Sequence, residues 1–184
     1  SIAQLNSVDD CKGKRKGKDI LNDYDTCKYF KKALQNYTLE DIKYLGMNLR
    51  YECASHKSVS NFYSCSMKEQ AMIGYVTLNL LDDGKYGKSI KNVVKYRHGH
   101  RGAYLFSWVP DVNFKTIDMN GSIFEQPVRV AIHILGGNPY FAQYNLGQKF
   151  YCRQDTSTCP WHTSANKKGK LEKVTMHHTF YREV

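Results

Sequence analysis

The stretch Ser66–Gly84, SMKEQAMIGYVTLNLLDDG, carries the strongest secondary-structure signal in the chain. Ser66 with Glu69 three residues later is the pattern of a helix N-terminus. Apolar side chains then recur at helical spacing, at Ala71, Met72, Tyr75, Val76, Leu78, Leu80 and Leu81. Gly84 is a typical helix stop. The sequence therefore predicts a helix from Met67 to Asp83.

The residues before this helix predict two shorter helices behind a basic loop. Apolar residues recur at helical spacing between residues 25 and 36. Thr38–Asp41 has the pattern of a second helix start, and Gly46 is its expected end. The Lys/Gly run at residues 11–18 is expected to be a solvated loop, or else an arm that contacts phosphate. Tyr51–Cys53 resembles a short strand.

The residues after this helix change to strand-like patterns. Aromatic or β-branched runs between turn residues predict strands at Ala103–Val109, Val128–Leu135, Tyr140–Tyr144, Lys149–Arg153 and Val174–Tyr181. A long helix followed by several antiparallel strands is typical of an α+β domain, with the helix packed on the sheet.

Length and composition exclude several classes of protein. A chain of 184 residues with 41% hydrophobic residues can bury one core, which excludes a disordered protein. It has no apolar run of the ~18–20 residues that a membrane span needs, so we expect a soluble protein. The net charge of +10 suggests an anionic partner. Residues 85–115 hold seven Lys or Arg and one acid, so the positive charge is concentrated there.

The segment Lys95–Arg101, KYRHGHR, is the densest candidate for chemistry. On a strand, His98 and His100 would face the same side as Tyr96, with Arg97 beside them. Imidazole, phenol and guanidinium groups can cleave an RNA phosphodiester by acid–base transfer, or hold a phosphate without cleaving it. A solvated basic loop is the third interpretation.

Cysteine and histidine usage favours a secreted protein and no metal. Six cysteines, an even number without a C-x-x-C pair, are typical of disulfides in a secreted chain. The sequons at Asn36 and Asn120 are compatible with that route. His133 lies in an apolar run and is expected in the core. We expect no metal and no cofactor, because no Cys/His cluster has ligand spacing.

The order of several motifs resembles one family. These motifs are Tyr51-Glu-Cys53, the helix Met67–Asp83, Tyr96-Arg-His98, Tyr104–Trp108, Pro127-Val-Arg-Val130, Gly136-Gly137 and Tyr151-Cys152. In this order they resemble the ribonuclease-like (RALPH) secreted effectors of powdery mildews, which are related in fold to the small guanyl-specific microbial ribonucleases. The resemblance covers about residues 51–153. It implies a microbial ribonuclease-like fold and a Cys53–Cys152 disulfide.

The resemblance also implies a degraded catalytic site. Tyr96, His98 and Arg129 match ribonuclease site residues. Ser107 stands where the family has its glutamate base, and the stretch that ends at Tyr144 lacks the family's histidine acid. Each missing acid or base costs ~10²–10⁴-fold in rate, so we expect a protein that is not an enzyme.

The remaining cysteines and the domain boundaries complete the expected architecture. Local pairing favours Cys11–Cys27, which leaves Cys65–Cys159. We expect a basic and helical extension over residues 1–50. The ribonuclease-like domain would follow at residues 51–184, with its core at 51–153 and a tail at 154–184. We expect a monomer without membrane contact.

Three functions fit these patterns. The first is a secreted fungal virulence effector, delivered into a host plant cell, that binds RNA or a host protein without turnover and suppresses plant immunity. The second is an active ribonuclease or ribotoxin that uses His98 and His100. The third is a protein-binding module recognised by a plant immune receptor. The expected phosphate contacts are Tyr96, Arg97, His98, His100, Arg101 and Arg129, with Tyr104 or Trp108 as a stacking platform.

Overall fold

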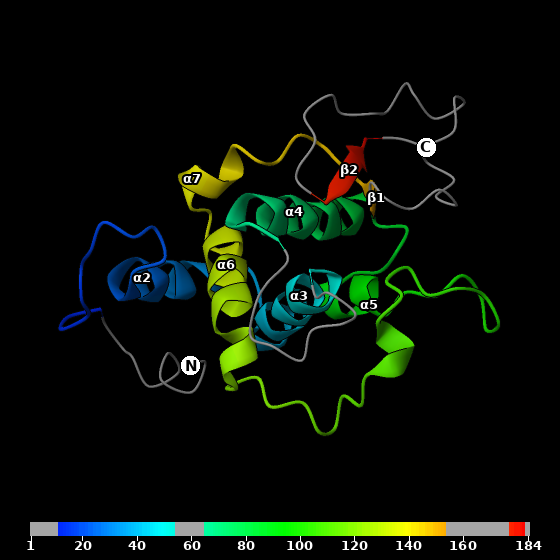
Figure 1. Cartoon of the computed structure of the whole chain (residues 1–184), viewed down its shortest axis with the longest axis horizontal. Helices are drawn as coiled ribbons and strands as arrows, with labels where there is room; N and C mark the ends of the chain where they lie inside the picture. The colour runs from blue at the N-terminus through cyan, green and yellow to red at the C-terminus, as the bar shows by residue number, and fades with distance from the viewer. Residues whose placement is uncertain (1–10, 54–64, 154–176, 183–184) are drawn as a thin grey trace.

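Helix α6 (Glu125–Leu135) lies at the centre of the computed structural model, which describes residues 11–53, 65–153 and 177–182 (Figure 1). Three helices pack against it, namely α2 (Asp23–Ala33), α3 (Leu39–Glu52) and α4 (Met67–Asp83). In Figure 1, α2 lies on one side of α6, and α3 and α4 lie on the other. The hydrophobic core forms where these four helices meet.

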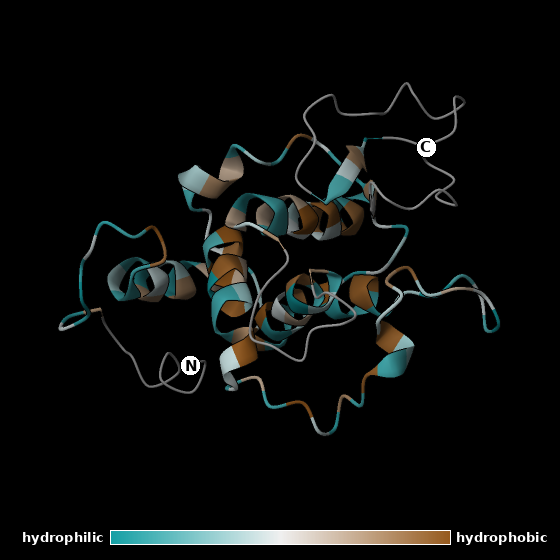
Figure 2. Cartoon of the chain, viewed as in Figure 1, coloured by the Kyte–Doolittle hydropathy of each residue, from teal (hydrophilic) through white to brown (hydrophobic). Residues whose placement is uncertain are grey.

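The strand expected at Val128–Leu135 is wrong, because this segment forms most of α6. Seven of its eight side chains are buried, and only Arg129 is partly exposed. An apolar, β-branched run gives no periodic signal when all sides are covered, so its pattern fits a buried strand and a buried helix equally. Figure 2 shows the hydrophobic residues concentrated on the central helices and the hydrophilic ones along the outer loops.

Helix α4 has the bounds that the sequence predicts. The Ser66 side chain accepts a hydrogen bond from the Glu69 backbone N–H at 3.2 Å. Gly84 ends the helix in the left-handed region, at φ 77°, where a residue with a Cβ is disfavoured. Cap residues at both ends thus explain where this helix begins and ends.

Helix α3 begins as expected but continues past Gly46. Thr38 and Asp41 form a complete capping box at its start. A Cβ at residue 46 would lie 2.8 Å from Val128 Cγ2, so this glycine allows α3 and α6 to approach closely instead of ending the helix. Tyr51 and Glu52 therefore belong to the last turn of α3, and the strand expected at Tyr51–Cys53 is wrong.

Two more of the expected strands are absent. In the stretch Ala103–Val109, Tyr104 forms an isolated bridge and residues 105–108 form bends and turns that lead into η1 (Val109–Asp111). The stretch Tyr140–Tyr144 contains most of α7 (Pro139–Ala142). The remaining short helices are α5 (Ile90–Val94) and η2 (Ser122–Phe124).

Two expected strands are present and pair with each other. Strand β1 (Phe150–Arg153) pairs antiparallel with β2 (His178–Tyr181), with Phe150 opposite Tyr181. The start of the expected strand at Val174–Tyr181 lies outside the described residues. The α+β class is thus confirmed in coarse form, as several helices with a two-stranded antiparallel sheet.

A single hydrophobic core crosses the expected domain boundary. Residues 50 and 51 both lie inside α3, and the core extends from Leu21 before α2 to Phe180 in β2. The described residues before position 51 therefore pack as part of the same body. None of the described helices is long and apolar enough to cross a membrane.

The disulfides confirm one expected pair and correct two. Cys11 is bonded to Cys27, as predicted. Cys53 is bonded to Cys65, with their Cα atoms 5.3 Å apart, so the expected pairs Cys53–Cys152 and Cys65–Cys159 are wrong. Cys53 ends α3 and Cys65 precedes α4, and these helices pack side by side. Cys152 is also disulfide-bonded.

Candidate functional site

Residues 96–105 form a short hairpin, which we call the basic hairpin. The backbone N–H of His98 donates to the Ala103 carbonyl at 3.0 Å, and that of Leu105 donates to the Tyr96 carbonyl at 2.9 Å. Arg97 and Tyr104 form an antiparallel bridge between these two bonds. The basic hairpin is therefore a turn held by a single bridge, and it takes the place of the first residues of the strand expected at Ala103–Val109.

Two glycines make this turn possible. Gly99 adopts φ 76°, in the left-handed region that favours glycine. A Cβ on Gly102 would lie 1.6 Å from the His98 carbonyl oxygen, so the two sides of the turn approach too closely for any other residue. His100 follows the turn at Gly99, so its expected alignment with Tyr96 and His98 on one strand face does not apply.

Aromatic rings support the base of the basic hairpin. The Arg97 guanidinium lies over the Tyr104 ring, 4.9 Å from its centroid, and its Nε donates to the Gly102 carbonyl at 2.8 Å. Lys95 Nζ lies 4.2 Å from the centroid of the Phe114 ring. Cation–π contacts of this kind hold the charged groups in place without neutralising them.

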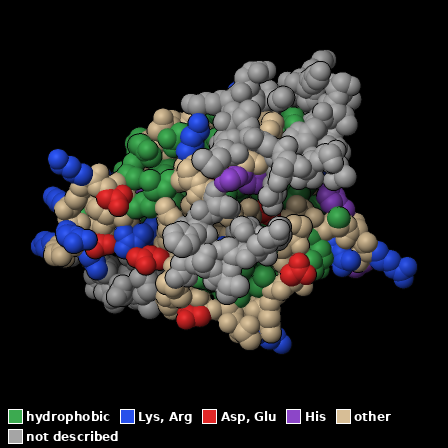
Figure 3. Space-filling model, viewed as in Figure 1, with side chains coloured by type: hydrophobic (Ala, Val, Ile, Leu, Met, Phe, Trp, Pro, Cys, Tyr) green, Lys and Arg blue, Asp and Glu red, His purple; other side chains and the backbone are tan. Residues whose placement is uncertain are grey.

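The tip of the basic hairpin is exposed and positively charged. Arg97, His98, His100 and Arg101 are all exposed. The sequence has no Asp or Glu from residue 84 to residue 110. The space-filling view shows Lys or Arg side chains and His side chains projecting at the edge of the molecule where this loop lies (Figure 3). The hairpin therefore offers exposed cations to an anionic partner, and its own loop contains no acid.

Arg129 lies on the other side of the molecule. It projects from α6 toward α2, where its guanidinium donates to the Leu21 carbonyl at 2.6 Å and to Asp23 Oδ1 at 2.8 Å. Glu125 lies 3.8 Å away. The predicted phosphate contact thus links α6 to α2 through Asp23 and the Leu21 carbonyl.

A cleft of about 830 Å³ lies beside Arg129 and the Lys/Gly loop at residues 11–18. Its charged lining residues have both signs. The cations are Arg15, Lys16, Lys18 and Arg129, and the acids are Asp19, Asp23 and Glu125. The same mixture of blue and red side chains is visible at the α2 end of Figure 3. This loop is therefore a weaker anion site than the basic hairpin.

The residues expected to form a degraded ribonuclease site do not meet in one place. Ser107 is exposed next to a small cavity, while Tyr144 follows α7 and packs against Tyr140 with ring centroids 6.0 Å apart. Only Tyr96 and His98 of the expected set lie together, with ring centroids 5.1 Å apart.

Trp108 is a core residue and not a stacking platform. It is 8% exposed, and its indole Nε1–H donates to Asn48 Oδ1 at 2.9 Å. Tyr104 is partly buried beneath Arg97. Neither ring therefore presents an open face of the kind that a nucleobase needs.

The small cavity beside Ser107 contains an acid that the sequence reasoning missed. It has a volume of about 190 Å³ and is lined by Glu52, Tyr104, Ser107, Lys149 and Tyr151 among others. Burial raises the pKa of Glu52, although hydrogen bonding to Tyr151 and the charge of His178 oppose the shift. Glu52 sits in the last turn of a helix, and no spacing in the sequence marks it.

This cavity does not assemble a catalytic pair with the basic hairpin. Ligand pockets usually measure ~300–1,000 Å³, so the cavity is small for a nucleotide. Among the described residues that line it, Tyr104 belongs to the hairpin, but His98 and His100 do not line it.

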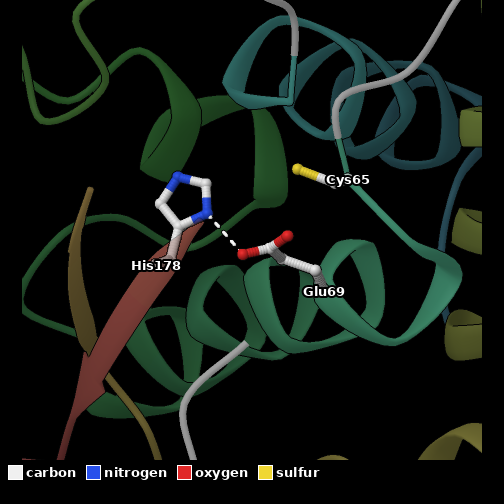
Figure 4. A group of neighbouring side chains, drawn as sticks. All are labelled: Cys65, Glu69 and His178. Atoms are coloured by element: carbon white, nitrogen blue, oxygen red, sulfur yellow. Dashed lines mark hydrogen bonds and ion pairs between the residues drawn. The ribbon is translucent and has the colours of Figure 1, made fainter. Parts of the chain in front are cut away.

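Buried polar side chains also gather at the start of α4 (Figure 4). His178 Nδ1 lies 2.9 Å from Glu69 Oε1, and the backbone N–H of His177 donates to the same oxygen at 2.9 Å. Cys65 Sγ, a Glu69 oxygen and a His178 nitrogen all lie within 4.8 Å of one another. The sequence predicted Glu69 only as a cap partner, because its contact with β2 is 109 residues away.

No protein-family model matches this chain, and neither a curated protein nor a solved structure is significantly similar to it.

Proposed function

We propose that this chain is a secreted, disulfide-bonded effector protein that binds single-stranded RNA through the basic hairpin and does not cleave it. The observation that carries the proposal is the exposed tip formed by Arg97, His98, His100 and Arg101, with no acid between residues 84 and 110. Arginine is well suited to phosphate because its guanidinium donates several hydrogen bonds in one plane.

The contrast with the N-terminal cleft supports this choice of surface. Arg129 is held by Asp23 and a backbone carbonyl, and three acids line the same cleft. A polyanion would have to displace these contacts there, whereas it meets unneutralised cations at the hairpin.

The absence of turnover follows from the placement of the proton-transfer candidates. His98 and His100 lie on opposite sides of the Gly99 turn and are exposed to solvent. Ser107 takes the position where the resemblance would place the glutamate base, and the stretch that ends at Tyr144 lacks the histidine acid. Glu52 lines the small cavity rather than the hairpin tip. Binding therefore fits this surface better than catalysis.

The effector role and its host-cell target come from the motif resemblance alone. The ribonuclease-like fold that the resemblance implies requires strands where α6 and α7 stand. The proposal therefore rests on the basic hairpin and not on that fold. Suppression of plant immunity, with recognition by a plant receptor, is the biological setting that the resemblance favours.

The test compares two variants with the same net charge. We expect Arg97→Gln/Arg101→Gln to weaken binding to a short fluorescent single-stranded RNA by about tenfold, because each exposed charge contributes roughly 0.2–1 kcal/mol. Arg15→Gln/Lys18→Gln removes two charges at the N-terminal cleft and should leave the affinity within about twofold. Equal losses in both variants, measured by fluorescence anisotropy, would contradict a localised site.

The same mixtures test for cleavage. End-labelled RNA incubated with the purified protein should stay full-length on a denaturing gel. Cleavage that disappears in His98→Asn would favour the active ribonuclease instead.

A further inference from the structure

The buried group at the start of α4 has the donor chemistry of a metal site. Cys65, Glu69 and His178 offer sulfur, carboxylate oxygen and imidazole nitrogen, all with ligand atoms within 4.8 Å of one another. Glu69 is fully buried, and Cys65 and His178 are 6% and 4% exposed. Figure 4 shows the three side chains converging from α4, from the segment that precedes it and from β2.

The geometry of the acid–imidazole pair is close to that of two zinc ligands. The 2.9 Å between His178 Nδ1 and Glu69 Oε1 compares with roughly 3.3 Å between two ligand atoms at the corners of a zinc tetrahedron with bonds of about 2.0 Å. A shift of a few tenths of an ångström would let a metal ion replace the proton between them.

Cys53 lies at the edge of this group and is the source of a fourth donor. Its sulfur is bonded to that of Cys65, and Cys53 is fully buried. A disulfide sulfur is a poor ligand, but each thiolate of the opened pair is a strong one. The core packing of α3 and α4 would keep Cys53 close to Cys65 after the bond opens.

We propose that reduction of the Cys53–Cys65 disulfide converts this place into a zinc site, with the thiolates of Cys53 and Cys65, the His178 imidazole and a Glu69 carboxylate oxygen as ligands. This inference is independent of RNA binding and goes beyond it. The metal would replace the disulfide as the link between the end of α3 and the start of α4.

The chemistry balances in two steps. A small dithiol gives two electrons and two protons to the S–S bond, so the protein gains two thiols and the dithiol becomes a cyclic disulfide. Zn²⁺ then binds, and the two thiols release two protons as they become thiolates. The His178 ring coordinates through Nδ1 in its neutral form, so its proton moves from Nδ1 to Nε2 and no third proton is released.

The test uses Co²⁺ as a spectroscopic probe of the full chain. The protein is reduced with a dithiol, separated from the reductant without air, and titrated with Co²⁺. We expect one equivalent of Co²⁺ to bind, with thiolate-to-cobalt charge-transfer bands and tetrahedral visible bands that Zn²⁺ abolishes. The oxidised protein should show neither band.

Three variants assign the ligands. His178→Asn should weaken the affinity of the reduced chain for Co²⁺ by at least about a hundredfold, while the neighbouring His177→Asn should retain it. Cys11→Ser/Cys27→Ser removes the other described disulfide and should also retain binding. Circular dichroism of each reduced sample reports whether the helices remain.

Three results would overturn the proposal. The reduced chain could bind no Co²⁺, whether it stays folded or unfolds. The bands could persist unchanged in His178→Asn, which would place the ligands elsewhere. They could also vanish in Cys11→Ser/Cys27→Ser, which would assign them to the other pair. A protein that fails to bind RNA would leave the interpretation of these three Co²⁺ experiments unchanged.

Discussion

His133 is a fully buried histidine held in its neutral form. Asn138 Nδ2 donates to its Nδ1 at 2.8 Å, so the proton sits on Nε2, which donates to Thr26 Oγ1 at 3.0 Å. Burial lowers the pKa of His133 from 6.5 to about 4. The core role expected from its apolar surroundings is confirmed, and its two polar partners explain why the position tolerates an imidazole.

This histidine predicts a specific loss of stability in acid. The unfolded chain binds a proton at pH values below about 6.5, while the folded chain stays neutral at this site down to about pH 4. The free energy of unfolding should therefore fall by about 3 kcal/mol between these pH values through His133 alone. Urea denaturation at a series of pH values measures this fall.

A matched pair of variants isolates the effect. His133→Asn should flatten the pH dependence between pH 6.5 and pH 4, whereas His98→Asn, at an exposed position, should keep it. The same slope in wild type and His133→Asn would show that other groups cause the acid sensitivity.

Glycines inside helices set how closely the core helices pack. A Cβ on Gly46 of α3 would meet Val128 Cγ2 of α6 at 2.8 Å, and one on Gly74 of α4 would meet Ile134 Cδ1 of α6 at 2.7 Å. We expect Gly46→Ala to destabilise the protein by about 1–3 kcal/mol through overpacking, despite a gain of up to about 1 kcal/mol in helix propensity. Thermal unfolding measures the difference.

The rescue variant gives the control. Gly46→Ala/Val128→Ala removes the clashing methyl group and should be more stable than the sum of the two single effects predicts. Additive effects would mean that contact with Val128 does not cause the loss.

A buried polar chain ties the segment after the basic hairpin to α3 and α4. Trp108 Nε1 donates to Asn48 Oδ1 at 2.9 Å, and Asn48 Nδ2 donates to Thr77 Oγ1 at 3.1 Å. We expect Trp108→Phe to cost about 1–3 kcal/mol of unfolding free energy, because the Asn48 oxygen loses its donor. In an Asn48→Ala background the same change should cost less, and a cost that stays equal would contradict the coupling.

Helices whose starts carry capping residues could be predicted from the sequence. Elements that depend on contacts between distant parts of the chain could not. The starts of α3 and α4 follow from Thr38 and Ser66, whose side chains satisfy local N–H groups. Helix α6 was not recognised, because buried β-branched residues dominate Val128–Leu135, although Glu125, Arg129 and His133 recur at helical spacing along it. Tertiary contact also turns Gly46 from an expected stop into a packing residue.

The candidate site was predictable only where its signal is local. The net positive charge of residues 85–115 marks the region of the basic hairpin directly in the sequence. Arg129, Ser107 and Tyr144 were grouped by motif order, and the fold separates them because α6 and α7 replace the expected strands. The Glu69–His178 contact spans 109 residues and left no local pattern.

The pairing of the cysteines depends on how the whole chain folds. Six cysteines allow fifteen pairings, and the packing of α3 beside α4 selects Cys53–Cys65. A non-reducing tryptic map should therefore join the peptide Tyr51–Lys57 to Ser58–Lys68. A link between Cys53 and the peptide that contains Cys152 would contradict this arrangement.

The salt dependence of RNA binding tests most directly whether the basic hairpin is the part of the molecule that binds phosphate. The affinity for single-stranded RNA should fall with salt, and its logarithm should depend linearly on the logarithm of the salt concentration. Arg97→Gln/Arg101→Gln should reduce the slope by about 1.4, at roughly 0.7 per lost phosphate contact. Arg15→Gln/Lys18→Gln should leave the slope unchanged. Parallel lines for wild type and the hairpin variant would contradict phosphate binding at the basic hairpin.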